Sequence, residues 1–183
     1  MMKFIRIGTT LILFLFLSNV LKAQKTEAYR NPDEKYLMGK EFFEHEQYES
    51  ARKHFTDFLR LSAGANSENY INATYYQALS AMRLFHKDAE YLMENFIDVH
   101  PESIWIHPAT WNLATYNFNR RDYDDALYWY NHIDQRDLDL LEKEEFNFNV
   151  GFAAFQEEQY EKAKLSFYEL KDNTNSEYQP ASA

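Results

Sequence analysis

The sequence QYEKAKLSF at residues 159–167 matches QYESARKHF at residues 47–55 and, more loosely, DYDDALYWY at residues 122–130. The three segments are centred on alanines that are separated by 75 and then 37 residues: Ala51, Ala126 and Ala163. Because 75 is close to twice 37, a further copy is expected near residue 88, and FHKDAEYLM with its central Ala89 stands there. A period of about 37 residues therefore indicates a repeat protein.

Each copy is preceded, by 11 or 12 residues, by a second small residue, and is completed by a large side chain four residues after its alanine. Small residues let two helix backbones approach closely, and residues four apart lie on one face of a helix. Each unit is therefore predicted to be a helical hairpin. The predicted packing residues are Gly39, Ala51, Phe55, Ala78, Ala89, Met93, Ala114, Ala126, Tyr130, Gly151, Ala163 and Phe167. We expect substitution at Gly151 to cost more stability than substitution at Gly64, which lies in a connection.

These hairpins resemble the tetratricopeptide repeat family. The resemblance is carried by YLMGKEFFEHEQYESARKHF, YYQALSAMRLFHKDAEYLM, TWNLATYNFNRRDYDDALYWY and FNVGFAAFQEEQYEKAKLSF, and it covers roughly residues 32–183. It implies an all-α fold, a right-handed superhelical array of antiparallel helical hairpins, or α-solenoid, with about four repeats. The units are expected near residues 32–65, 68–101, 106–135 and 141–172, with the start of a fifth at 176–183.

Helix-capping signals agree with these units. Asn31 precedes Pro32 and a first turn rich in acidic residues, which is typical of a helix N-terminus. Asp139 and Glu142 have the spacing of a capping box, so a second N-terminus is expected there.

The first 23 residues have the layout of a secretory signal. Basic residues are followed by a short apolar run from Leu11 to Leu17 and then by small or apolar residues up to Ala23. A membrane span needs about 20 apolar residues, so we expect residues 1–23 to be cleaved and residues 24–31 to form a linker. The protein is then exported, to the periplasm if the host is a Gram-negative bacterium; the alternative is anchoring to the inner membrane by an uncleaved signal.

The composition disfavours several partners. After signal removal 16 basic residues remain against 29 acidic residues, a net charge of −13. Nucleic acid and bare anionic membrane are therefore poor partners, and the acidic residues are expected to form a solvated outer face. With no cysteine, neither lipid modification at an N-terminal cysteine nor a disulfide is possible.

The motifs expected of an enzyme are missing from the sequence. The glycines outside the signal are too few and too scattered for a phosphate-binding loop, and the six histidines form no His-x-x-x-His pair. His86 and Glu90 share a helical face, but one such pair is more typical of a surface contact than of a metal site. We expect no catalytic residues, no metal site and no cofactor; an unrecognised enzyme remains the remote alternative.

The resemblance implies that the first helix of each hairpin lines a concave binding face. The candidate peptide-binding residues are Lys40, Tyr75, Arg83, Trp111, Asn112, Thr115, Asn119, Phe148, Asn149 and Gln156. Phe43 and Phe152 are further candidates, for which core packing is an equally good interpretation. Asn112 and Asn149 lie one period apart, each two residues before the small residue, and resemble the asparagine ladders of family members that hold peptides by their main chain.

Two functions then compete. The first is a protein-protein interaction adaptor or scaffold of the bacterial cell envelope, which binds an extended peptide or a partner's loop. This is supported by a resemblance of YEKAKLSFYELKDNTNSEYQPASA to long envelope tetratricopeptide proteins. The second is a structural array that self-associates through its C-terminal hairpin or continues into further repeats, because the last helix carries more apolar residues than its partner helix can cover.

Overall fold

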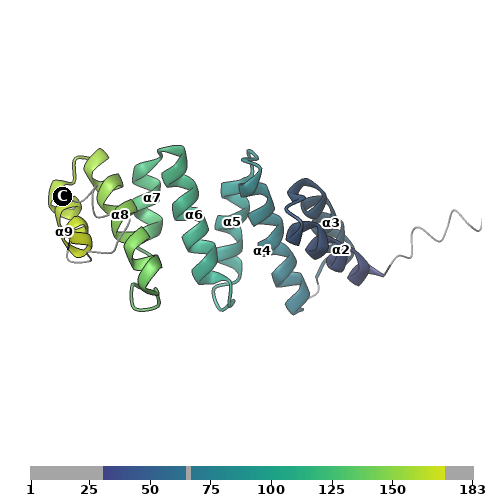
Figure 1. Ribbon diagram of the computed structural model, residues 1–183. Helices are drawn as coiled ribbons and strands as arrows, with labels where there is room; N and C mark the ends of the chain where they lie inside the picture. The colour runs from purple at the N-terminus through teal and green to yellow at the C-terminus, as the bar shows by residue number, and fades with distance from the viewer. Residues whose placement is uncertain (1–30, 65–66, 172–183) are drawn as a thin grey trace, which may run out of the picture.

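The computed structural model describes residues 31–64 and 67–171, where every regular element is an α-helix. The helices lie in a single row in chain order, with successive helices packed against each other (Figure 1). They form four hairpins: α2 (Pro32–Glu44) with α3 (Tyr48–Leu61), α4 (Glu68–Arg83) with α5 (Ala89–Val99), α6 (Ile106–Arg120) with α7 (Tyr123–Tyr130), and α8 (Leu140–Gln156) with α9 (Tyr160–Lys171). The prediction of an all-α, solenoid-like array of paired helices is confirmed.

Three predicted segments fall wholly or largely outside the described residues. They are the signal at residues 1–23, the linker at 24–31 apart from its last residue, and the start of a fifth unit at 176–183.

The predicted caps are confirmed at both helices where the sequence placed them. The Asn31 side chain accepts a hydrogen bond from the backbone N–H of Asp33 at 3.2 Å, directly before α2. At α8, Asp139 accepts from the Glu142 N–H at 2.9 Å and the Glu142 carboxylate accepts from the Asp139 N–H at 3.0 Å. These bonds satisfy N–H groups that the first helical turn leaves without partners.

The two helices of every hairpin are joined by the same turn. In each turn one residue has a positive φ, between 53° and 67°, and it lies seven residues after the small residue of the first helix: Glu46, Phe85, Arg121 and Glu158. Its N–H and the following N–H bond back to helix carbonyls in the pattern of a Schellman motif, for example Glu46 to Phe43 and Gln47 to Phe42. The four turns are therefore in phase, which shows the repeat in the backbone itself.

The two helices of a hairpin meet where the small residue faces the large side chain. A Cβ atom added at Gly39 would lie 2.7 Å from the Phe55 ring, and one added at Gly151 would lie 2.7 Å from the Phe167 ring. Phe55, Met93 and Tyr130 are fully buried. The second hairpin differs because α5 begins at Ala89 itself, whereas the other second helices begin three residues before their alanine.

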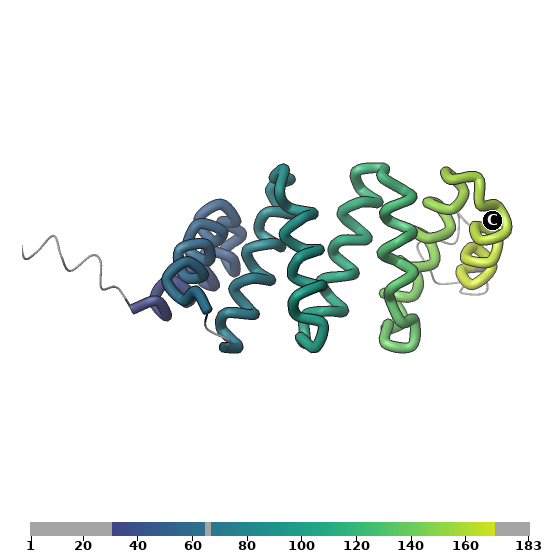
Figure 2. Tube along the Cα trace, turned by 180° about the vertical axis from the view of Figure 1, so that it is seen from behind, coloured from purple at the N-terminus to yellow at the C-terminus, as the bar shows by residue number. Residues whose placement is uncertain are grey.

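Neighbouring hairpins pack mainly through the second helix of one against the first helix of the next, and their first helices also contact each other. α4 contacts both α2 and α6, and α6 also contacts α8; in the described part of the chain no comparable contact joins one second helix to the next. Closer spacing of the first helices is expected on the inner side of a curved array. The row of hairpins is seen from behind in Figure 2, where α2 and α9 lie at opposite ends. A site between first helices therefore lies on the face where the sequence predicted binding.

Candidate functional site

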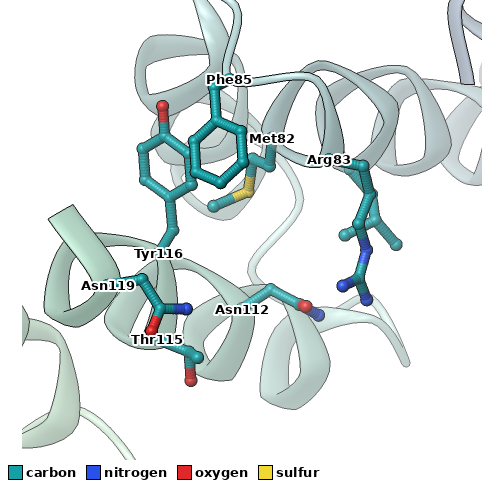
Figure 3. A pocket seen from close by; sticks show the side chains of 8 residues that line it. Met82, Arg83, Phe85, Asn112, Thr115, Tyr116 and Asn119 are labelled. Atoms are coloured by element: carbon teal, nitrogen blue, oxygen red, sulfur yellow. The ribbon is translucent and has the colours of Figure 1, made fainter.

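A pocket of about 180 Å³ lies between α4 and α6 (Figure 3). Residues of α4, of its following turn and of α6 form the walls: Leu79, Met82, Arg83, Phe85, Asn112, Thr115, Tyr116 and Asn119. The α6 contribution is a stripe at positions i, i+3, i+4 and i+7, which share one face of a helix. Four of the predicted binding residues, Arg83, Asn112, Thr115 and Asn119, are thus brought together here.

The pocket borders positions of α6 at which a neighbouring first helix carries an aromatic ring. Between α6 and α8, Phe152 stands where Thr115 stands in the previous unit, and its ring lies 5.8 Å from those of Phe118 and Tyr123. Between α2 and α4, Tyr76 stands where Asn112 stands in the next unit and packs edge-on against Phe43 at 4.9 Å. Aromatic rings therefore contact each other in these two gaps, whereas Thr115 and Asn112 stand at the corresponding positions between α4 and α6.

One end of the pocket is aromatic. The Phe85 ring stacks on Tyr116, with 5.8 Å between ring centroids and 25° between ring planes. Figure 3 shows the Met82 sulfur beside these rings. On Tyr116 the guanidinium of Arg120 also lies 5.3 Å from the ring centroid, a cation–π contact. This end therefore offers apolar, polarisable surface to a ligand.

The other end is polar, and Arg83 and Asn112 lie there (Figure 3). The Asn112 amide nitrogen donates to the Pro108 carbonyl at 2.7 Å and to the Tyr75 hydroxyl at 3.4 Å. Both amide hydrogens are thus used within the protein, and the carbonyl oxygen of Asn112 is the group left for a ligand. Burial raises the pKa of Tyr75 to about 12, and Tyr76 adds to the rise, while Arg83 and the Asn112 bond act against it. The Tyr75 hydroxyl therefore stays protonated at neutral pH.

Arg83 supplies the formal charge of the pocket. It is the one charged side chain among the eight lining residues, it is exposed, and it forms no salt bridge with a described residue. A guanidinium group presents five N–H donors in a planar fork that suits a carboxylate. The polar end can therefore hold an anionic group.

The other predicted binding residues lie apart from this pocket. Lys40 faces Glu44 at 4.0 Å on α2, Gln156 is exposed at the end of α8, and Trp111 packs edge-on against Tyr130 at 6.1 Å. Tyr75 is buried against Trp105, with 4.7 Å between their centroids. Phe148 stacks on Phe152 at 6.2 Å.

Asn149 lies in a different environment from Asn112, although the two occupy the same position in the repeat. Its side chain is buried, at 5 % exposure, and donates to the Tyr130 hydroxyl at 2.9 Å. Asn112 is half-buried and borders the pocket. The two amides therefore serve the packing of adjacent helices in both units, and Asn112 alone also lines the pocket.

Four lining residues were not predicted from the sequence: Leu79, Met82, Phe85 and Tyr116. A signal for Phe85 was present, because the other three units have a charged residue at the same turn position, namely Glu46, Arg121 and Glu158. Phe85 therefore departs from the pattern of the other three units at this turn position. The remaining three residues carry no such signal.

Comparison with known proteins gives no relative: no protein-family model matches the chain, and no curated protein is significantly similar to it. In the described ranges there is no cluster of three or more His, Cys, Asp or Glu side chains that could hold a metal ion. Within those same ranges, none of the helices is both long enough and apolar enough to span a membrane.

Proposed function

We propose that this chain is a non-catalytic binding protein, a tetratricopeptide-like adaptor that holds an extended peptide or a partner's loop on the face formed by α2, α4, α6 and α8. The observation that carries the proposal is the pocket between α4 and α6, since it lies on that face and gathers residues from two hairpins. Its volume of about 180 Å³ is below the roughly 300–1,000 Å³ typical of sites for whole small molecules, so it suits one side chain of a larger partner.

Export is part of the proposal. Residues 1–23 have a signal layout, and an adaptor of the cell envelope fits both this layout and the acidic composition. Mass spectrometry of the exported protein tests it, with a mature chain that begins at Gln24 as the expected result. An intact chain in the membrane fraction would instead support the anchored alternative.

Photo-crosslinking tests the binding face. A benzophenone amino acid is placed at Thr115, inside the pocket, or at Tyr91, which is 67 % exposed on α5 and serves as the control. We expect the Thr115 probe to give a discrete adduct with a partner in envelope extract and the Tyr91 probe to give none. Equal adducts from both positions would contradict binding on the face of the first helices.

A second candidate is self-association through the last hairpin. Phe155, Tyr160 and Leu165 are 54 %, 57 % and 69 % exposed, and the first two pack edge-on against each other at 5.9 Å. By contrast, Leu170 is buried and Phe167 packs on Gly151. Light scattering coupled to size-exclusion chromatography decides between a monomer and a concentration-dependent oligomer, and a Leu165→Glu variant should lower the mass if this surface is used.

A further inference from the structure

Phe85 has two features that its turn does not explain. Its φ of 53° is not one of them, because the same left-handed conformation occurs in the turn of every hairpin. Its side chain is 67 % exposed although it is apolar. It also borders two hollows, the pocket between α4 and α6 and a more open one that includes Arg52, His86 and Lys87. An exposed aromatic residue beside a pocket, at a turn position where the other three hairpins carry a charged residue, indicates a role in binding.

The pocket as a whole has about the volume that one aromatic ring needs. An apolar cavity of roughly 150 Å³ in another protein admits benzene, and the present pocket measures about 180 Å³. Phe85 and Tyr116 offer ring faces and edges, and Met82 offers a thioether, all of which favour an aromatic guest.

The charges beside this ring site that form no salt bridge are positive, because Asp88 pairs with Arg52, and Glu90 and Asp122 pair with Arg120. Arg83 and Lys87 lie two residues before and two residues after Phe85, and neither forms a salt bridge with a described residue, whereas Arg52 pairs with Asp88 at 2.5 Å. The chain as a whole has a net charge of −10, and the hollow that includes Glu94, Asp98 and Asp125 is formed by α5 and α7. The pocket is therefore a locally positive site on an acidic protein.

We propose that the pocket between α4 and α6 binds an acidic-aromatic peptide segment, with an aromatic side chain against Phe85 and Tyr116 and a neighbouring Asp or Glu carboxylate on Arg83. This proposal rests on the proposed function and names the class of its partner. The Asn112 carbonyl oxygen accepts a backbone N–H of the bound segment. The carboxylate belongs to a side chain within the segment, so a free peptide C-terminus is not required.

The test measures fluorescence polarisation with the purified full chain and three labelled peptides blocked at both ends. Their central residues are Phe-Asp-Glu, Ala-Asp-Glu and Phe-Lys-Lys. The variants are Phe85→Gly, in which glycine accepts the left-handed turn and preserves the fold, and Arg83→Glu, which reverses the pocket charge. The matched controls are Glu158→Gly, at the same turn position of the fourth hairpin, and Lys53→Glu, at an exposed position of α3.

We expect the Phe-Asp-Glu peptide to bind the native chain and both controls more tightly than the other two peptides do. Phe85→Gly should weaken its binding by about tenfold or more, the loss typical of an aromatic anchor. Arg83→Glu should weaken it by roughly threefold to fivefold, as expected for a solvent-exposed ion pair, and should favour the Phe-Lys-Lys peptide. Equal binding of the Ala-Asp-Glu peptide, no binding of any peptide, or an unchanged affinity in Phe85→Gly would each overturn the inference. If the partner crosslinked from Thr115 still binds both variants, the adaptor function stands and only this ligand class is wrong.

Discussion

At the residue scale, the least satisfied group in the described part of the chain is the side chain of Asn117. It is fully buried on α6, and neither its amide nitrogen nor its carbonyl oxygen has a hydrogen-bond partner there. The corresponding residues of the second and fourth units, Ala81 and Ala154, are buried alanines. A buried polar group without a partner costs about 1–3 kcal/mol, so this asparagine destabilises the third hairpin.

We therefore predict that Asn117→Leu, which keeps the number of side-chain heavy atoms, raises the free energy of unfolding by about 1 kcal/mol. Asn149→Leu should have the opposite effect and lower it by roughly 1–2 kcal/mol, because the Tyr130 hydroxyl loses the amide donor found at 2.9 Å. Urea unfolding of the two variants provides the measurement. A similar loss in both would show that Asn117 is satisfied in solution, for example by a buried water molecule.

A pH effect is predicted at Glu94. Burial raises the pKa of this carboxyl, and the charges of Glu90 and Asp98 on α5 and of Asp125 on α7 raise it further. Because the folded state then holds the proton more tightly than the unfolded state, stability falls as pH rises through the folded pKa. Glu94→Gln should therefore raise the melting temperature at pH 7 and have little effect near pH 4. Glu102→Gln, at an exposed position, is the control, and equal shifts at both pH values would argue against this coupling.

At the element scale, glycine substitution probes the hairpin seam. Gly151→Leu should cost about 1–3 kcal/mol through overpacking against Phe167, and the loss should shrink in a Phe167→Ala background, where the ring no longer occupies the space.

The sequence alone suggested that the same change at Gly64 would cost much less stability. In the structure a Cβ at Gly64 meets nothing within 4 Å, but the φ of +84° adds strain of about 1–2 kcal/mol for any other residue. Thermal melts of the single and double variants separate the two causes, since Phe167→Ala should rescue only Gly151→Leu.

Substitutions in the hairpin turns are predicted to raise the free energy of unfolding rather than lower it. Glu46 and Glu158 adopt the left-handed conformation at exposed turn positions, where glycine has no Cβ penalty. Glu46→Gly and Glu158→Gly should each raise the free energy of unfolding by about 0.5–1 kcal/mol, the difference between the strain removed and the entropy glycine adds to the unfolded chain. Denaturant titration checks the effect. A loss in both variants would mean that the glutamate side chains stabilise the turns in a way the hydrogen bonds do not reveal.

At the scale of the whole molecule, the contacts within each hairpin could be predicted from the sequence, because they depend on the spacing of residues along the chain. Gly39 and Phe55, or Gly151 and Phe167, belong to one hairpin, so their pairing follows from helical periodicity and one turn. The pocket depends on the sizes of the side chains that lie between two hairpins, such as Thr115. The spacing of residues in the sequence does not show how well these side chains fill that space. The same limit explains Asn112 and Asn149, which are equivalent in the repeat but differ in burial because the surrounding rings differ.

The buried residues also predict which helices of the array unfold most easily. Helix α4 contributes Ala73 to the core of the first hairpin and Ala78 to that of the second, and α6 contributes Leu113 and Ala114 to two successive cores. Helices α4 and α6 thus each pack into two neighbouring cores, whereas α2 and α9 lie at the ends of the described array (Figure 2). Repeat arrays are stabilised by contacts between neighbours, and their ends open at lower free energy than their middle.

Hydrogen exchange followed by mass spectrometry should therefore find the slowest amides in α4 and α6 and the fastest helical amides in α2 and α9. A Leu113→Ala variant should speed exchange in the second and third hairpins together, because its side chain lies in the core those hairpins share, and should leave α2 and α3 nearly unchanged. Uniform exchange from all eight described helices would show instead that the array unfolds as one cooperative unit.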